Sequence, residues 1–112
     1  MAQIIDFKAF MDETGIDEEL LVPLYETFLE EIIEENDNMI NAYKNNDYDE
    51  LAKIIHTIKG VLGSYRVTIA YDKATQLNSL LKQKEFNKLD SLIKDLSFEI
   101  SKAVKEIESY CK

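Results

Sequence analysis

Apolar residues recur every three or four positions along most of this chain, which is the spacing of amphipathic helices. The pattern predicts a short helix followed by four longer ones, over residues 6–13, 17–43, 48–64, 68–84 and 87–110. One proline and three glycines leave few turn signals for a β-rich fold. Because the connections are short, successive helices should be antiparallel neighbours. We therefore predict an all-α fold, an up-down four-helix bundle with a short additional N-terminal helix.

Single residues mark several of the expected helix ends. Asp6 can accept the free N–H groups of the first turn of the short helix, and Gly15 can close that helix in the left-handed conformation. Pro23 must lie in or near the first turn of the second helix, or bend it. Asp47 is the expected cap of the third helix and Thr68 that of the fourth.

The apolar stripes define the side of each long helix that should face the core. The expected core comprises Leu21, Leu24, Phe28, Ile32, Met39 and Tyr43 of the second helix, Ile69, Leu77, Leu80 and Leu81 of the fourth, and Leu89, Leu92, Leu96, Ile100, Ala103, Ile107 and Tyr110 of the fifth.

Length and charge narrow the class of protein. A chain of 112 residues suits a single domain over residues 1–112. Its net charge of -9 disfavours nucleic-acid and anionic lipid partners and favours partners with basic patches. No apolar run is long enough for a membrane span, no signal peptide is recognisable, and the single Cys111 has no internal disulfide partner. We expect a cytoplasmic location, and the starting Met1 favours a free-standing protein.

The stretch "HTIKGVLGSYR", residues 56–66, holds the only histidine of the chain and two of its three glycines. Glycine inside a helix costs about 1 kcal/mol relative to alanine. On a helical wheel of about 100° per residue, the apolar positions fall on the side opposite His56. The expected core face is Leu51, Ile54, Ile55, Ile58, Val61, Leu62 and Tyr65, whereas Lys59, Gly60 and Gly63 share the outer face with His56.

An exposed imidazole beside bare backbone suggests that a large group must approach it closely. No Ser or Cys lies beside His56 for a hydrolytic triad, and one His with one Cys is too few for a zinc site. "GVLGSYR" is not a P-loop either. A histidine that accepts or donates a phosphoryl group brought by a partner fits best, with Lys59 offsetting negative charge.

"IIHTIKGVLG" resembles the core motif of histidine phosphotransfer (HPt) domains, in which a helical His is followed by Lys three and Gly four residues later. The likeness extends over the whole chain, through "FKAFMDETGIDEELLVPLYETFLEEI" and "NNDYDELAKIIHTIKG". It implies a four-helix bundle that carries a phosphoryl group in a two-component phosphorelay. Such a domain is a phosphocarrier, not an enzyme, and has no cofactor of its own.

The resemblance also implies roles for single residues. His56 would accept the phosphoryl group, Lys59 would lie near its oxygens, and Gly60 would give clearance to a receiver domain. Gly63 would add to that clearance, and Asn78 on the next helix would touch the imidazole. The implied partners are response-regulator receiver domains, which supply the aspartyl phosphate and Mg²⁺, and a hybrid sensor kinase. The protein would be a monomer.

Three residues depart from the family pattern. Val61 and Leu62 replace small residues after the Lys-Gly pair, and Arg66 stands where a glycine often closes the segment. These departures leave open an HPt-like module that docks a partner without phosphotransfer. A dimerising kinase domain with its own phosphorylated His agrees less well, because Thr57 follows His56 where an acidic residue is typical.

Overall fold

The computed structural model describes residue 5 and residues 7–111. This part of the chain contains the five expected helices: α1 (Phe7–Thr14), α2 (Glu18–Lys44), α3 (Tyr48–Ser64), α4 (Thr68–Lys82) and α5 (Leu89–Tyr110). Each forms at a predicted stretch of helical apolar spacing. The all-α prediction is therefore confirmed, and the bounds of α3 agree with those expected.

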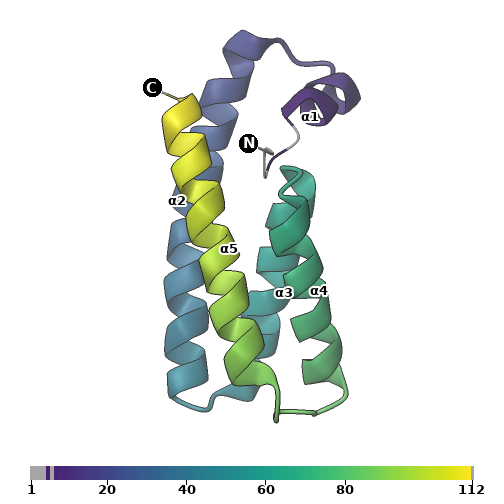
Figure 1. Cartoon of the computed structure of the whole chain (residues 1–112), viewed down its shortest axis with the longest axis vertical. Coiled ribbons are helices and arrows are strands. Elements are labelled where there is room, and N and C mark those ends of the chain that lie inside the picture. The colour runs from purple at the N-terminus through teal and green to yellow at the C-terminus, as the bar shows by residue number, and fades with distance from the viewer. Residues whose placement is uncertain (1–4, 6, 112) are drawn as a thin grey trace.

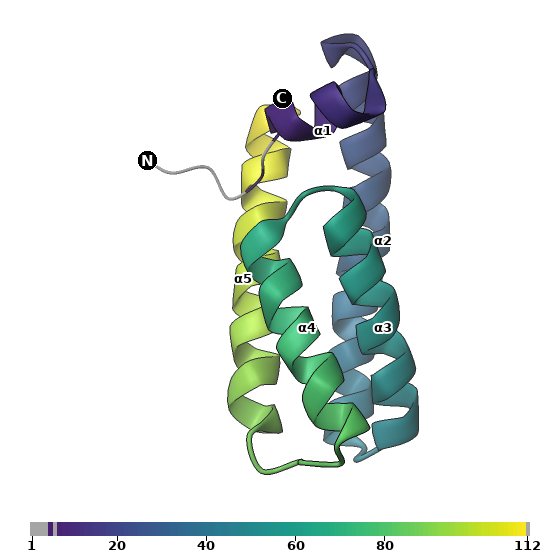
Figure 2. The ribbon, with the colours of Figure 1, turned by 90° about the vertical axis from the view of Figure 1, so that its right-hand side faces the viewer.

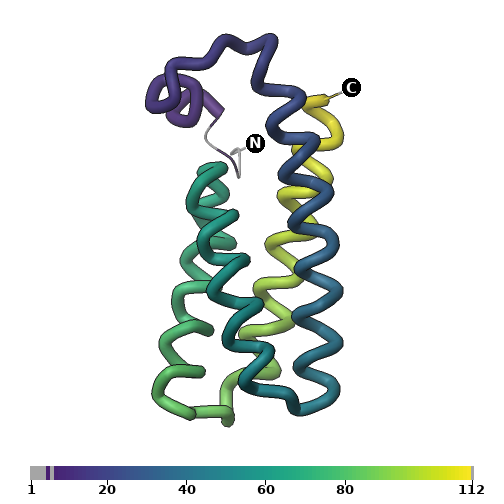
Figure 3. Tube along the Cα trace, turned by 180° about the vertical axis from the view of Figure 1, so that it is seen from behind, coloured from purple at the N-terminus to yellow at the C-terminus, as the bar shows by residue number. Residues whose placement is uncertain are grey.

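The four long helices form an up-down bundle in which each packs against two others (Figure 1). α3 lies between α2 and α4, and α5 closes the ring between α4 and α2. α1 crosses one end of the bundle, above the turn between α3 and α4 (Figures 2 and 3). In the described part of the chain, no helix has both the length and the apolarity to cross a membrane.

The core runs along the inner faces of the long helices and continues under α1. Its largest fully buried side chain is Tyr25, whose hydroxyl donates a 2.6 Å hydrogen bond to the carbonyl of Tyr65. Phe10 of α1 stacks on the Tyr65 ring, with 5.6 Å between ring centroids. An aromatic cluster therefore joins α1 to the C-terminal end of α3.

The connections that follow α2, α3 and α4 share one backbone arrangement. After each helix a non-glycine residue adopts a positive φ: Asn46 at 55°, Arg66 at 63° and Lys84 at 56°. At Arg66 the amide donates to the carbonyl of Gly63, and the next amide, of Val67, donates to that of Leu62. These two bonds define the Schellman motif, in which glycine is the usual left-handed residue. Gly15 closes α1 at a φ of 70°, as predicted.

Several predicted helix ends need correction. Thr68 is the first residue of α4 rather than its cap, which is Val67. The predicted helix over 68–84 ends at Lys82, because the Schellman turn uses the residues after Lys82. The fifth helix begins at Leu89 rather than at residue 87. Pro23 lies inside α2 just after its first turn, which agrees with the prediction that it lies in or near that turn. The Asp47 side chain caps α3 as predicted, accepting from the amide of Glu50 at 3.2 Å, whereas Asp6 lies outside the described residues.

The expected core was right in most places and wrong at Ile69, which is 45% exposed. Ala70 and Ala74 occupy the buried side of α4 instead, because its small residues allow close packing on α3 and α5. On α2 the stripe missed Tyr25 and Ala42, and on α5 it missed Ile93, all of which are buried. The remaining expected positions at the edge of the core are half-buried: Leu24, Tyr43, Val61, Tyr65, Leu80, Leu92 and Tyr110.

Candidate functional site

His56 projects from the outer face of α3. The opposite face of this helix is buried along its whole length through Leu51, Ile54, Ile55, Ile58 and Leu62. A helix that buries this stripe must turn His56 outward, and the side chain is exposed. Gly60, one turn later, is exposed as well, whereas Lys59 and Gly63 are half-buried. The predicted exposure of the imidazole is confirmed.

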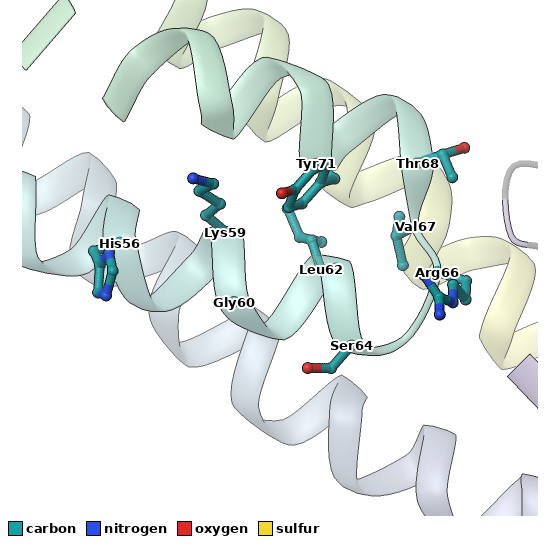
Figure 4. A pocket seen from close by; sticks show the side chains of 10 residues that line it. His56, Lys59, Gly60, Leu62, Ser64, Arg66, Val67, Thr68 and Tyr71 are labelled. Atoms are coloured by element: carbon teal, nitrogen blue, oxygen red, sulfur yellow. The ribbon is translucent and has the colours of Figure 1, made fainter. Parts of the chain in front are cut away.

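An open groove of ≈ 650 Å³ runs from His56 along the space between α3 and α4. We call it the α3–α4 groove; it is lined by His56, Lys59, Gly60, Leu62, Gly63, Ser64, Arg66, Val67, Thr68 and Tyr71. Figure 4 shows Lys59 reaching from α3 toward α4, and the Tyr71 ring pointing back from α4 toward α3. His56 and Arg66 lie at opposite ends of the groove (Figure 4).

A second recess, of ≈ 460 Å³, lies on the other side of His56. We call it the Asn78 hollow; it is lined by Ala52, Lys53, His56, Thr57, Asn78, Leu81 and Lys82. Asn78 and His56 thus border the same recess across α3 and α4. Among the described residues no hydrogen bond joins their side chains, so the predicted contact of Asn78 with the imidazole stays a prediction.

The charged residues that line the two recesses beside His56 are all basic. Lys59 and Arg66 line the α3–α4 groove, and Lys53 and Lys82 line the Asn78 hollow. No described Asp or Glu lines either recess, although the chain carries 22 acidic against 13 basic residues. The two recesses that His56 borders are thus lined by four cations, on a protein of net charge -9. This arrangement favours an anionic group at His56.

The two glycines of α3 differ in their surroundings. A Cβ built on Gly60 meets no described atom within 4 Å, so Gly60 leaves open space beside the helix one turn from His56. A Cβ on Gly63 would lie 3.0 Å from Cε2 of the Tyr71 ring. The missing side chain of Gly63 thus admits Tyr71 between α3 and α4. The structure thus gives Gly63 a packing role within the fold, and its expected clearance role for a partner stays a prediction.

Two kinds of residue that line these recesses were not predicted from the sequence. Lys53 lies three residues before His56, and Lys82 lies four residues after Asn78, so helical spacing alone places each beside a predicted site residue. Tyr71 and Thr68 join the site only through the packing of α4 on α3, which no local pattern encodes. Among the described residues, no group of three or more His, Cys, Asp or Glu side chains is placed to hold a metal ion.

Comparisons with known proteins agree with this geometry. The family model described as Hpt domain matches residues 23–110. The HPT domain of the Hpt sensor hybrid histidine kinase from Shewanella has 17% sequence identity and a TM-score of 0.84, over 96% of this chain and 92% of its own. Histidine-containing phosphotransfer protein B from Pseudomonas aeruginosa has 16% identity and a TM-score of 0.87, over 99% and 96%. At these identities the two structures establish the fold. A comparison with curated protein sequences gave no match.

Proposed function

This chain belongs to the Hpt domain family, and on that premise we propose that it is a phosphorelay carrier whose phosphoryl group resides on His56. Domains of this family are phosphocarriers rather than catalysts in their own right. The observation that carries the proposal is the position of His56, exposed between two recesses whose charged residues are all cations. An imidazole so placed is open to a protein partner and suited to an anionic group.

The proposed reaction moves one phosphoryl group between two side chains. The lone pair of the outward ring nitrogen, which we take to be Nε2, attacks the phosphorus of an aspartyl phosphate on a receiver domain. The N–P bond forms as the O–P bond breaks, and the aspartate leaves as a carboxylate. The other ring nitrogen keeps its proton during the attack. The reverse transfer follows the same path.

The residues around His56 take different parts in this step. Lys59 offsets the negative charge of the phosphoryl oxygens, and the open space at Gly60 admits the partner's active face. Asn78 orients the imidazole from the other side. The partner supplies the acyl phosphate and Mg²⁺, so the protein needs no cofactor of its own. Receiver domains and a hybrid sensor kinase are the proposed partners of a monomeric, cytoplasmic protein.

Two of the three departures from the family pattern, Val61 and Leu62, have little effect on the exposed surface around His56. Leu62 is completely buried, and Val61 is half-buried against the same core. Both side chains therefore enlarge the core contact of α3 rather than cover His56. Arg66 is different, because its side chain is 40% exposed at the end of the α3–α4 groove, whereas Leu62, which also borders that groove, is completely buried. Nothing in the site favours a module that docks a partner without phosphotransfer over a phosphocarrier.

A transfer profile tests the proposal. Each receiver domain of the source organism is loaded from ³²P-acetyl phosphate, freed of the donor and mixed with the protein. At least one receiver should pass its label to the wild type and none to His56→Gln. A receiver that binds wild type and His56→Ala equally, with no transfer from any receiver, would support the docking module instead.

A further inference from the structure

Arg66 is the only arginine among the chain's 13 basic residues. It lies in the turn between α3 and α4, and its side chain lines the far end of the α3–α4 groove from His56 (Figure 4). Arg66 lies ten positions after His56, which corresponds to about 15 Å at a helical rise of about 1.5 Å per residue. Arg66 is therefore too far away to touch a phosphoryl group on His56, and a contact between Arg66 and a docked partner would involve the body of that partner.

The backbone at Arg66 does not favour an arginine. Its φ of 63° is the left-handed conformation of a Schellman turn, which costs a residue with a Cβ roughly 1–2 kcal/mol and costs glycine almost nothing. The turn itself is well formed, since Val67 and Leu62, the two residues that pack across such a turn, are both fully buried. A glycine would serve the turn better, so the turn alone does not explain the arginine.

One contact of that side chain is known. The Arg66 guanidinium forms an ion pair with the carboxylate of Glu13 in the last turn of α1. The side chains of both partners are well exposed, at 40% and 53%. Exposed ion pairs contribute about 0.2–1 kcal/mol. The pair therefore offsets at most part of the backbone cost, and stability does not explain Arg66.

We propose that Arg66 is a partner-recognition residue that binds an acidic side chain on the docked receiver domain. The proposal rests on the phosphorelay function proposed above. The groove that it lines has Lys59 as its other charged residue and no described acidic residue in its lining, so a carboxylate that enters the groove meets cations, with the Glu13 carboxylate beside Arg66 but outside that lining. A guanidinium has five N–H donors, and one carboxylate uses at most two of them. Glu13 thus holds the side chain at the rim of the groove and still leaves donors for a partner.

The test compares two matched substitutions. Arg66→Asn removes one positive charge at a left-handed position, where asparagine is tolerated. Lys84→Asn makes the same change at the left-handed residue that follows α4, at the opposite end of that helix and outside both recesses. Net charge and backbone change equally in the two variants, so they differ in the place of the lost cation and in the loss of the Arg66–Glu13 ion pair, an exposed pair that contributes about 0.2–1 kcal/mol. The probe is the receiver domain that transfers fastest to the wild-type protein in the profile described above.

We expect Arg66→Asn to slow transfer from this receiver about fivefold to tenfold at low ionic strength, and Lys84→Asn to change it less than about twofold. The difference should shrink in about 0.5 M salt, where charges are screened over a few ångströms. Equal rates for the two variants at low salt, with both folded by circular dichroism, would overturn the proposal.

A small phosphodonor separates this outcome from failure of the proposed function. Phosphoramidate needs no docking surface, so each receiver-driven rate is divided by the phosphoramidate-driven rate of the same variant. A wild-type protein that takes no phosphate from any receiver contradicts the phosphorelay function itself. If a receiver does phosphorylate the wild type, and the ratio of receiver-driven to phosphoramidate-driven rate is the same in Arg66→Asn as in the wild type, only the recognition role of Arg66 is contradicted.

Discussion

The Tyr71 ring lies where a side chain on Gly63 would have to go. An ideal Cβ at Gly63 falls 3.0 Å from Cε2 and 3.2 Å from Cδ2 of that ring, closer than two carbon atoms pack without strain. Gly60, one turn earlier on the same helix, has no described atom within 4 Å of the equivalent Cβ. The two glycines of the His56 motif therefore serve different purposes. One lets α4 pack on α3, and the other leaves the surface of α3 open.

Alanine substitutions should separate these two purposes. Gly60→Ala should raise the free energy of unfolding by about 1 kcal/mol, because alanine is the better helix former and its methyl group meets nothing. Gly63→Ala should be less stable than Gly60→Ala by about 1–2 kcal/mol, because the Tyr71 ring must move. Urea unfolding of the two variants measures the difference.

The control repeats the Gly63→Ala substitution in a protein that lacks the Tyr71 ring. In a Tyr71→Ala protein the obstacle is gone, so Gly63→Ala should become as favourable as Gly60→Ala. A double-mutant cycle then isolates the Gly63–Tyr71 contact. If Gly63→Ala is equally unfavourable with and without the Tyr71 ring, the packing role assigned to Gly63 is wrong.

A larger side chain at Gly60 should impede the partner without harming the fold. Gly60→Gln keeps a good helix former on an exposed face, so helical circular dichroism and stability should be at least those of the wild type. Transfer from the receiver should slow by about tenfold or more, because the partner's phosphoryl group is held away from His56. Unchanged transfer kinetics in a folded Gly60→Gln protein would contradict the clearance role.

The buried hydroxyl of Tyr25 should contribute to stability and not to phosphotransfer. Tyr25→Phe removes the 2.6 Å hydrogen bond to the Tyr65 carbonyl and should lower the free energy of unfolding by about 1–2 kcal/mol. Tyr48→Phe is the matched control, because its hydroxyl bonds at 3.3 Å to Asn46 in an exposed position. If chemical denaturation shows that both variants lose a similar free energy of unfolding, the stabilising role assigned to the buried hydrogen bond is wrong.

Alkaline pH should destabilise the fold. Burial, the largest cause in each case, raises the pKa of Tyr43, Tyr65 and Tyr110 above 10.0 and that of Cys111 above 9.0. The folded state therefore keeps these protons after the unfolded chain has begun to lose them, and stability falls as pH rises beyond those values. The urea midpoint should be independent of these groups near pH 7.5 and should decrease as pH rises above about 9. Tyr65→Phe should make the decrease shallower, and an equally steep decrease in that variant would argue against the contribution of Tyr65.

The sequence predicted the helices well because their apolar stripes are regular. α3 is the clearest case, since its expected bounds and the outward position of His56 both follow from one helical wheel. The errors cluster where several helices compete for the same space. Ile69 was expected inside because it is apolar, but Ala70 and Ala74 face the neighbouring helices and leave Ile69 exposed.

The site was predictable only on the helix that carries it. His56, Lys59 and Gly60 share the outer side of α3 by spacing, and so does Lys53. Tyr71 enters the site by tertiary packing, and the pairing of Arg66 with Glu13 depends on how α1 crosses the bundle. A pattern read along one segment cannot supply such contacts, because they depend on how two segments are placed in space.

The position of the phosphoryl group tests the central claim most directly. The wild-type protein and His56→Gln are each mixed with a phosphorylated receiver, digested at neutral pH to preserve acid-labile phosphohistidine, and sequenced by tandem mass spectrometry. We predict one acid-labile phosphate on His56 of the wild type and none on the folded His56→Gln variant. A phosphate on another residue, or equal labelling of the two proteins, would contradict the assignment of this chain as a carrier that works through His56.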